Sequence, residues 1–194
     1  LSVSYAMSET VTLTSVTALQ DRVMDRNLFG LGFPEDQEPF SQELRLQQNS
    51  TNWQTTFGVY FQDAEFTRDD AGFPGFFGPS QNQITEETIA AFGEVTTRIG
   101  AADLTVGGRW SDEDADVDFE RVMLGPLAFT AKDSYSEFSP KVALGWTTSG
   151  GQRVYGVLSR GFKPGGFNHT VRGAPDAAPY DTETSTNLEL GWRS

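Results

Sequence analysis

The chain has 194 residues, of which 37% are hydrophobic, and a net charge of −13 at pH 7. A helical membrane protein is excluded, because no run of about 18 apolar residues occurs. Nucleic acid is excluded as a partner, because its phosphates require a basic protein face. The absence of cysteine excludes disulfides, thiolate metal sites and a cysteine nucleophile. The single histidine, His169, leaves little room for a histidine-based metal site.

Apolar and polar residues alternate with a period of two in about nine segments, and no pattern of period 3.6 runs for long. The predicted fold class is therefore all-β and antiparallel. The predicted strands, in chain order, span residues 2–7, 11–24, 40–48, 53–67, 84–99, 104–118, 137–148, 153–162 and 183–193.

The predicted connections alternate between short and long. The short ones are residues 8–10, 49–52, 100–103 and 149–152, and the long ones are 25–39, 68–83, 119–136 and 163–182. Outer-membrane barrels have short periplasmic turns at one end and long extracellular loops at the other. A soluble β-sandwich has no physical reason to alternate so strictly, although it could do so by chance.

The strand faces favour a membrane. The segments 53–61 and 138–146 each carry an apolar stripe of alternate residues with an aromatic at both ends. Eight steps of roughly 3.3 Å give about 26 Å, close to the ~25 Å apolar band of such barrels. Trp53, Trp146 and Trp192 are predicted at one level near the short turns. Phe61, Trp110 and Phe138 are predicted nearer the long loops.

The opposite faces and the strand extensions are polar. Asp112, Asp114, Asp116 and Asp118 continue the parity of Trp110, so that strand is predicted to leave the membrane there. Mixed charges on the other face suit a wet lumen or a barrel packed on a polar plug, although an ordinary solvated sheet face would look the same. In the last strand, Leu188, Leu190 and Trp192 are predicted on the convex face, with Asn187, Glu189 and Arg193 on the concave face.

Three motifs occur in order near the C-terminus. They are Ser139-Pro-Lys141, the segment 154–168 with its Gly-Phe-Lys-Pro-Gly-Gly core, and Glu189-Leu-Gly-Trp192. With the earlier segments 40–46 and 57–61, they resemble the barrel of TonB-dependent outer-membrane receptors. The alternative is a glycine-rich turn in a soluble β protein. The residues that match the family signature, expected at the extracellular rim, are Gly161, Phe162, Lys163, Pro164, Gly165, Gly166, Phe167 and Asn168.

The resemblance implies a function in the bacterial outer membrane. Receptors of this family take up ferric siderophores or a similar scarce nutrient through a roughly 22-stranded barrel closed by an N-terminal plug. TonB, with its ExbB/ExbD energising complex, is the expected partner, together with outer-membrane lipid and lipopolysaccharide, and the complete receptor is expected to be monomeric. Residues 1–194 would be a partial barrel domain without the plug and the remaining strands, so alone they would not transport.

Positive charge gathers near the expected rim. Arg160, Lys163 and Arg172 could steer an anionic ferric chelate towards the mouth. Each could equally pair with loop carboxylates or lipopolysaccharide phosphates. Phe73, Phe76 and Phe77 could contact a ligand or pack their loop against a neighbour.

Enzyme chemistry finds little support, and no cofactor or metal site is expected. The run 112–118 lacks the glycine and terminal glutamate of an EF-hand, which favours a solvated strand extension over a calcium site. The adjacent Glu86 and Glu87 point to opposite faces of a strand and make a poor catalytic pair. Ser159 has no nucleophile-elbow pattern around it, and the Gly-rich segment lacks a phosphate-loop spacing. A passive porin and a soluble β-sandwich binding module remain as alternatives.

Overall fold

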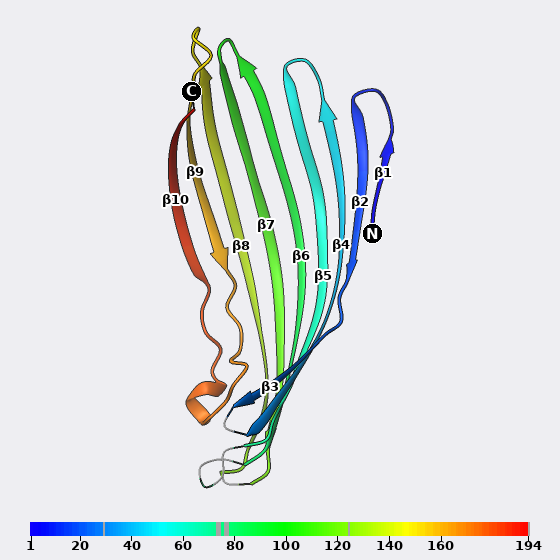
Figure 1. Cartoon of the computed structure of the whole chain (residues 1–194), viewed down its shortest axis with the longest axis vertical. Helices are drawn as coiled ribbons and strands as arrows, with labels where there is room; N and C mark the ends of the chain where they lie inside the picture. The colour runs from blue at the N-terminus through cyan, green and yellow to red at the C-terminus, as the bar shows by residue number, and fades with distance from the viewer. Residues whose placement is uncertain (29, 73–74, 76–77, 124, 194) are drawn as a thin grey trace.

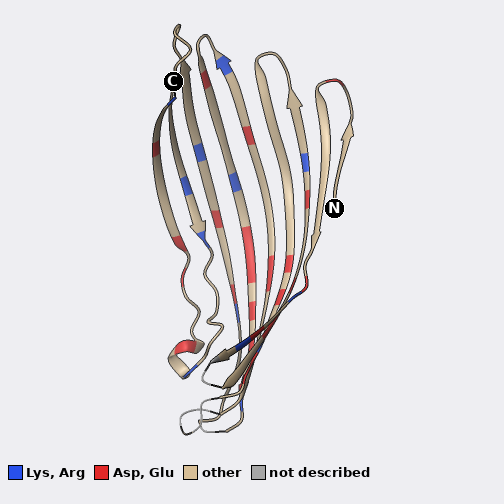
Figure 2. Cartoon of the chain, in the orientation of Figure 1, with Lys and Arg blue, Asp and Glu red and all other residues tan. Residues whose placement is uncertain are grey.

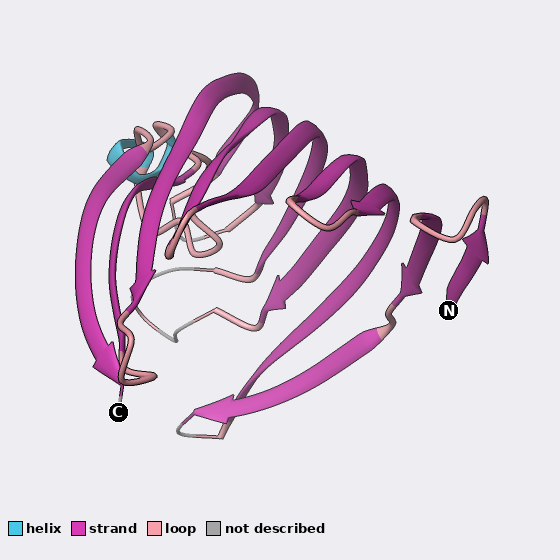
Figure 3. Ribbon diagram, turned by 90° about the horizontal axis from the view of Figure 1, so that it is seen from above, coloured by secondary structure: helices cyan, strands magenta, loops and turns pink. Residues whose placement is uncertain are grey.

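The computed structural model describes residues 1–28, 30–72, 75, 78–123 and 125–193. The chain forms one antiparallel sheet curved into an open trough (Figures 1 and 3). Its strands are β1 (Ser2–Ala6), β2 (Val11–Leu19), β3 (Arg22–Leu28), β4 (Leu31–Asn49), β5 (Trp53–Asp70), β6 (Ser80–Ile99), β7 (Ala102–Arg121), β8 (Leu127–Thr147), β9 (Arg153–Lys163) and β10 (Glu183–Arg193). Neighbouring strands follow the order β1-β2-β4-β5-β6-β7-β8-β9-β10, and β3 pairs with β4. The all-β antiparallel prediction is confirmed.

Helical structure is slight. A 3-10 helix, η1 (Ala174–Ala177), lies in the connection between β9 and β10. Over the described ranges, no helix has the length and apolar character needed to cross a bilayer.

The predicted strand 11–24 is divided at Gln20 and Asp21. Leu19 pairs with Phe40 and Arg22 with Gln37, so β2 and β3 keep the same register on β4 and the interruption inserts no residue. Gln20 donates its N–H to Pro39 O at 3.0 Å, but Pro39 has no N–H to return. The strand therefore continues beyond the break, which explains ten strands where about nine were predicted.

Three of the four predicted long connections are shorter than predicted. β5, β6, β7 and β8 run far into segments 68–83 and 119–136, and β3 and β4 occupy most of 25–39. The connection between β9 and β10, residues 164–182, remains a long loop. The four short turns lie where they were expected, at the end of the sheet opposite this loop (Figure 1).

The aromatic levels are confirmed by the register. Trp146 and Trp192 both pair with Val154. Trp53 leads through three successive pairings to Leu144, two residues from Trp146. At the other level, Trp110 pairs with Phe138, and Phe61 leads through three pairings to Ser136, two residues from Phe138. We call these rows the short-turn girdle and the long-loop girdle.

The two faces of the sheet exchange character at the long-loop girdle. Between the girdles, the large apolar side chains are exposed on the convex face. Beyond it, the buried apolar residues lie on the concave face, in a cluster formed by Phe66, Ile84, Ala115, Val117 and Phe167. The β5–β8 strands thus extend past the girdle because they gain a core on their inner side.

Glycines and large side chains interlock across the strands. Gly58 pairs with Phe92, and Phe57 with Gly93, on adjacent positions of β5 and β6. A Cβ on Gly93 would lie 2.6 Å from Phe57 Cδ1, and one on Gly58 would lie 2.8 Å from the Leu44 carbonyl oxygen. Each ring therefore lies over the bare backbone of the opposite strand.

We expect Gly58→Ala to destabilise the folded barrel by about 1–3 kcal/mol, because the added methyl group overlaps both the Phe92 ring and backbone that cannot move aside. Unfolding of the complete receptor in lipid would measure the change. Gly32→Ala is the matched control, since a Cβ there has no atom within 4 Å. Equal stability of the two variants would contradict the interlock.

Candidate functional site

The sheet between the girdles has one apolar and one polar face. Val106, Val142, Leu158 and Leu188 are paired across four strands in one row of the apolar face. The adjacent row contains Glu94, Gly107, Lys141, Ser159 and Asn187. Leu188 and Leu190 are 71% and 78% exposed, as expected for a face turned to lipid. The predicted division of β10 into an apolar and a polar face is confirmed.

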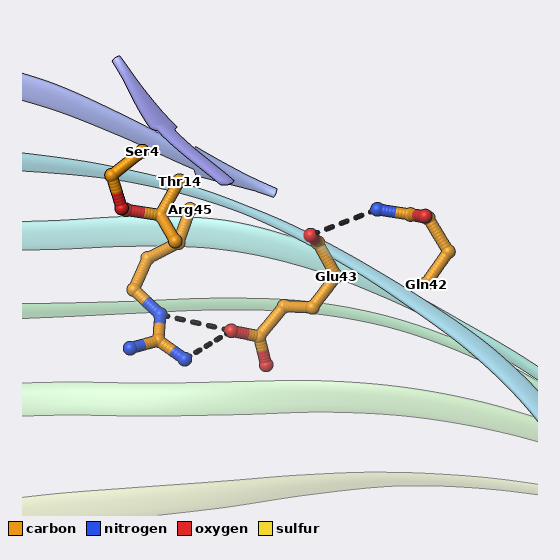
Figure 4. A network of polar contacts seen from close by, with 5 residues as sticks. All are labelled: Ser4, Thr14, Gln42, Glu43 and Arg45. Atoms are coloured by element: carbon orange, nitrogen blue, oxygen red, sulfur yellow. Dashed lines mark hydrogen bonds and ion pairs between the residues drawn. The ribbon is translucent and has the colours of Figure 1, made fainter. Parts of the chain in front are cut away.

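Ion pairs and hydrogen bonds cover the polar, concave face. Lys141 Nζ lies 2.7 Å from Glu94 Oε2, and Arg45 pairs with Glu43 on β4 (Figure 4). The Ser4 and Thr14 hydroxyls are 3.0 Å apart in the same network. Ion pairs and paired hydroxyl groups are not compatible with contact to lipid. This face is therefore hydrated or packed against polar protein.

A pocket of about 480 Å³ opens on this face near the short turns. Asp103 is one of its lining residues and lies 3.3 Å from Arg98 Nε and 3.0 Å from Arg153 Nη1. One carboxylate therefore compensates two guanidinium groups. Trp53 and Tyr155 are also among the lining residues.

The signature residues 161–168, which we call the rim segment, lie at the long-loop end. Gly161, Phe162 and Lys163 finish β9 opposite Ser185, Thr184 and Glu183. Gly166 and Tyr180 exchange two backbone hydrogen bonds of 3.1 and 2.9 Å, which close the base of the 164–182 loop. Neither Gly165 nor Gly166 has positive φ.

Glycine at 165 is required by the space available and not by a special backbone angle. A Cβ on Gly165 would overlap the Tyr135 ring and the Tyr180 carbonyl oxygen. The loop backbone thus lies directly against β8. Burial and the nearby Asp133 carboxylate raise the pKa of Tyr135 to about 12, so the phenol stays protonated at neutral pH.

The 164–182 loop is anchored on the concave face. Phe167 is 3% exposed within the apolar cluster, and His169 stacks on Phe66 with ring centroids 4.1 Å apart. Asn82 Nδ2 donates to Asn168 O at 3.0 Å. His169 is exposed to water in part, and the partial burial of its ring lowers its pKa, which favours neutral imidazole.

A smaller pocket of about 380 Å³ lies between this loop and the ends of β9 and β10. It is lined by Lys163, Phe167, Asn168, His169, Tyr180 and Glu183. Lys163 Nζ lies 5.3 Å from the Tyr180 ring centroid, within cation–π range. The pocket combines one cation, Lys163, and one carboxylate, Glu183, beside the Tyr180 ring.

The three expected steering residues are not brought together. Arg160 Nη2 pairs with Glu137 Oε2 at 3.3 Å. The backbone pairing between β8 and β9 ends at Lys141 and Ser159. The next pair would be Pro140 with Arg160, and proline has no N–H to donate. The Arg172 side chain is exposed, while its backbone N–H donates to Asp176 Oδ2 at 2.9 Å. Lys163 alone lines the small pocket.

Acidic residues gather beyond the long-loop girdle (Figure 2). Asp63, Glu87 and Asp114 are paired in one row on the outer face. Asp116 forms a 2.7 Å pair with Lys132 there. On the concave side, burial and the nearby Glu86 raise the pKa of Glu113. The predicted contacts of Phe73, Phe76 and Phe77 fall outside the described residues.

The geometry defines a class of protein: part of the wall of a transmembrane β-barrel, with a polar lumen and a loop-lined mouth. The sequence profile described as TonB dependent receptor-like, beta-barrel, matches residues 2–194. The chain belongs to this family, whose members are transport receptors of the bacterial outer membrane.

Individual relatives agree. The chain is 29% identical over 141 residues to the pesticin receptor of Yersinia enterocolitica, a match that covers 71% of this chain and 21% of that receptor. The pesticin receptor of Yersinia pestis is 30% identical over 116 residues, covering 59% of this chain and 17% of the receptor. The chain thus spans about a fifth of the curated relatives' length.

Solved structures give the same result. The ferric yersiniabactin uptake receptor FyuA from Yersinia pestis matches with a TM-score of 0.88 and 25% identity, over 99% of this chain and 32% of that chain. The siderophore receptor PiuA from Acinetobacter baumannii matches with a TM-score of 0.68 and 15% identity, over 98% of this chain and 36% of that chain, and supports the fold.

Sequence reasoning missed three residues that hold the loop: Phe66, Asn82 and Arg121. Phe66 could have been noticed from the sequence. The large apolar residues of β5 around Phe57 are at odd positions, whereas Phe66 is at an even position and so lies on the opposite face. Asn82 and Arg121 bond to backbone carbonyl oxygens of a distant loop, and no sequence spacing announces such contacts.

We expect Leu188→Arg to cost about 2–4 kcal/mol in the complete barrel if residue 188 lies at the bilayer midplane, whereas the lumen-facing Asn187→Arg should be tolerated. Folding into lipid vesicles of defined thickness would measure both. Equal tolerance at the two positions would show that the apolar face does not contact lipid.

We expect Gly165→Ala to loosen the 164–182 loop, since the methyl group displaces the loop from Tyr135. Limited proteolysis should cut this loop faster in the variant. Gly161→Ala is the control in the same segment, because its Cβ would meet only Ser185 Oγ at 3.5 Å. Identical cleavage of the two variants would refute the close contact.

Proposed function

We propose that the complete protein is a receptor for energy-coupled uptake of ferric siderophores, or of a similar scarce nutrient, across the outer membrane. The observation that carries the proposal is the two-faced wall with the inward-folded rim segment, in a chain that belongs to the TonB-dependent receptor family. By the topology of such barrels, the short turns face the periplasm and the 164–182 loop faces outward.

The proposal includes parts beyond this chain, which forms a partial barrel domain. A plug domain would fill the lumen, and the charged concave face supports this role. Arg98 and Arg153 share Asp103, and Arg109 is held by aromatic rings, so polar plug groups would find partners there. TonB, energised by ExbB/ExbD, would act on the plug. The complete receptor would work as a monomer, surrounded by lipid and lipopolysaccharide.

The proposed ligand is a ferric chelate, carried as cargo, and the protein is proposed to be neither an enzyme nor a holder of a cofactor. Two matched relatives are named for pesticin and for ferric yersiniabactin uptake, which supports a chelate of this general kind. The rim segment, with Lys163 at the small pocket, is the proposed contact region.

Uptake by the complete receptor tests the function. The full gene should be expressed in a Gram-negative strain that lacks its own siderophore receptors. Expression should restore accumulation of radioactive iron from a panel of ferric siderophores. Deletion of TonB in the same strain should abolish it. Accumulation that persists without TonB would indicate a passive porin instead.

The rim charges give a second test. Replacing Arg160 and Lys163 with Ala in the complete receptor should weaken capture of an anionic ferric chelate, and more so at low ionic strength, where charge attraction is least screened. Equilibrium binding at two salt concentrations measures this. Lys132→Ala, a loss of positive charge on the outer face, should have a smaller effect. Unchanged binding by the double variant would leave the rim segment with a structural role only.

A further inference from the structure

Arg121, the last residue of β7, is a buried cation at the long-loop end. The residue is only 6% exposed, and its guanidinium lies 6.0 Å from the Phe119 ring centroid. Among the described residues, no carboxylate lies within ion-pair distance of it. A buried charge is costly unless other groups satisfy it, so the acceptors that do so are the informative feature.

Those acceptors are backbone carbonyl oxygens from two separate connections. Arg121 Nε donates to Gly125 O at 2.8 Å, in the turn between β7 and β8. Its Nη1 donates to Val171 O at 3.3 Å and to Arg172 O at 3.1 Å, in the loop between β9 and β10. One rigid planar group therefore joins segments about fifty residues apart in the chain.

The carbonyl groups are held in place from the loop side as well. Asp176 Oδ2 accepts from Arg172 N at 2.9 Å and from Gly173 N at 3.2 Å, which fixes the backbone beside the acceptors. A third connection joins the assembly, since Gly78 N donates to Met123 O at 3.2 Å. Hydrogen bonds to charged donors are roughly twice as strong as neutral ones, so Arg121 is the central link.

We infer that Arg121 is a clasp: it joins Gly125, just before β8, and the 164–182 loop into a single rigid unit of the rim, with the pocket beside Lys163 preformed. This loop is then a fixed part of the mouth, and it moves only together with the segment around Gly125. The inference concerns the ligand-free protein and does not depend on the identity of the cargo.

Hydrogen exchange on the complete receptor in lipid nanodiscs, without ligand, tests the clasp. Arg121→Gln should raise exchange about tenfold or more in two places at once, around Gly125 and around residues 168–173, because both lose a charged hydrogen bond. Exchange in the girdle region of β5–β8 should stay unchanged. Lys132→Gln, an exposed cation of the same sheet, should alter neither loop.

A second variant covers the case in which the glutamine protein fails to fold. Arg121→Lys keeps the charge and the aliphatic stem, but its single ammonium cannot reproduce the planar fork that spans both connections. It should therefore increase exchange in at least one of them and uncouple the two. Wild-type protection in the lysine variant, or faster exchange in only one connection of the glutamine variant, would overturn the inference.

Discussion

The exchange of polarity at the long-loop girdle governs the structure. Between the girdles, the sheet must present apolar side chains outward to lipid and polar ones to the lumen. Beyond Trp110 and Phe138, lipid no longer covers the outer face, and the outward positions become acidic. The inner positions become free to form a conventional core. The same strands thus face lipid over one part of their length and water over the next. The 164–182 loop packs on an apolar cluster only because of this exchange.

This division explains where the sequence was informative. The alternation in β5 and β8 between the girdles follows directly from lipid contact, so the apolar face, the aromatic levels and the short turns could be predicted. The extensions could not, because Phe129 and Ala131 occupy the parity that is polar lower in β8. The apolar stripe of the outer face ends at Phe138, and residues 119–136 were therefore expected to form a loop.

The site divides in the same way. The rim segment and its end of the barrel could be recognised from ordered motifs, since glycine and proline announce the departure from β9. Its inward packing depends on Phe66 and Ile84, which are remote in sequence, and on a steric fit at Gly165. Arg160 was expected either to steer a ligand or to pair with a nearby carboxylate, and it pairs with Glu137. Its neighbour Lys163 differs because it lines a pocket.

The interlocked glycines have a consequence for assembly. A slip of one residue between β5 and β6 would turn every side chain to the wrong face and is rejected by polarity. A slip of two residues preserves the faces, so polarity cannot reject it. Phe57 would then oppose Ala91 or Val95, and Phe92 would oppose Thr56 or Tyr60, where no bare backbone receives a ring. Steric fit at these few positions therefore selects one register between β5 and β6 from those that polarity alone would allow.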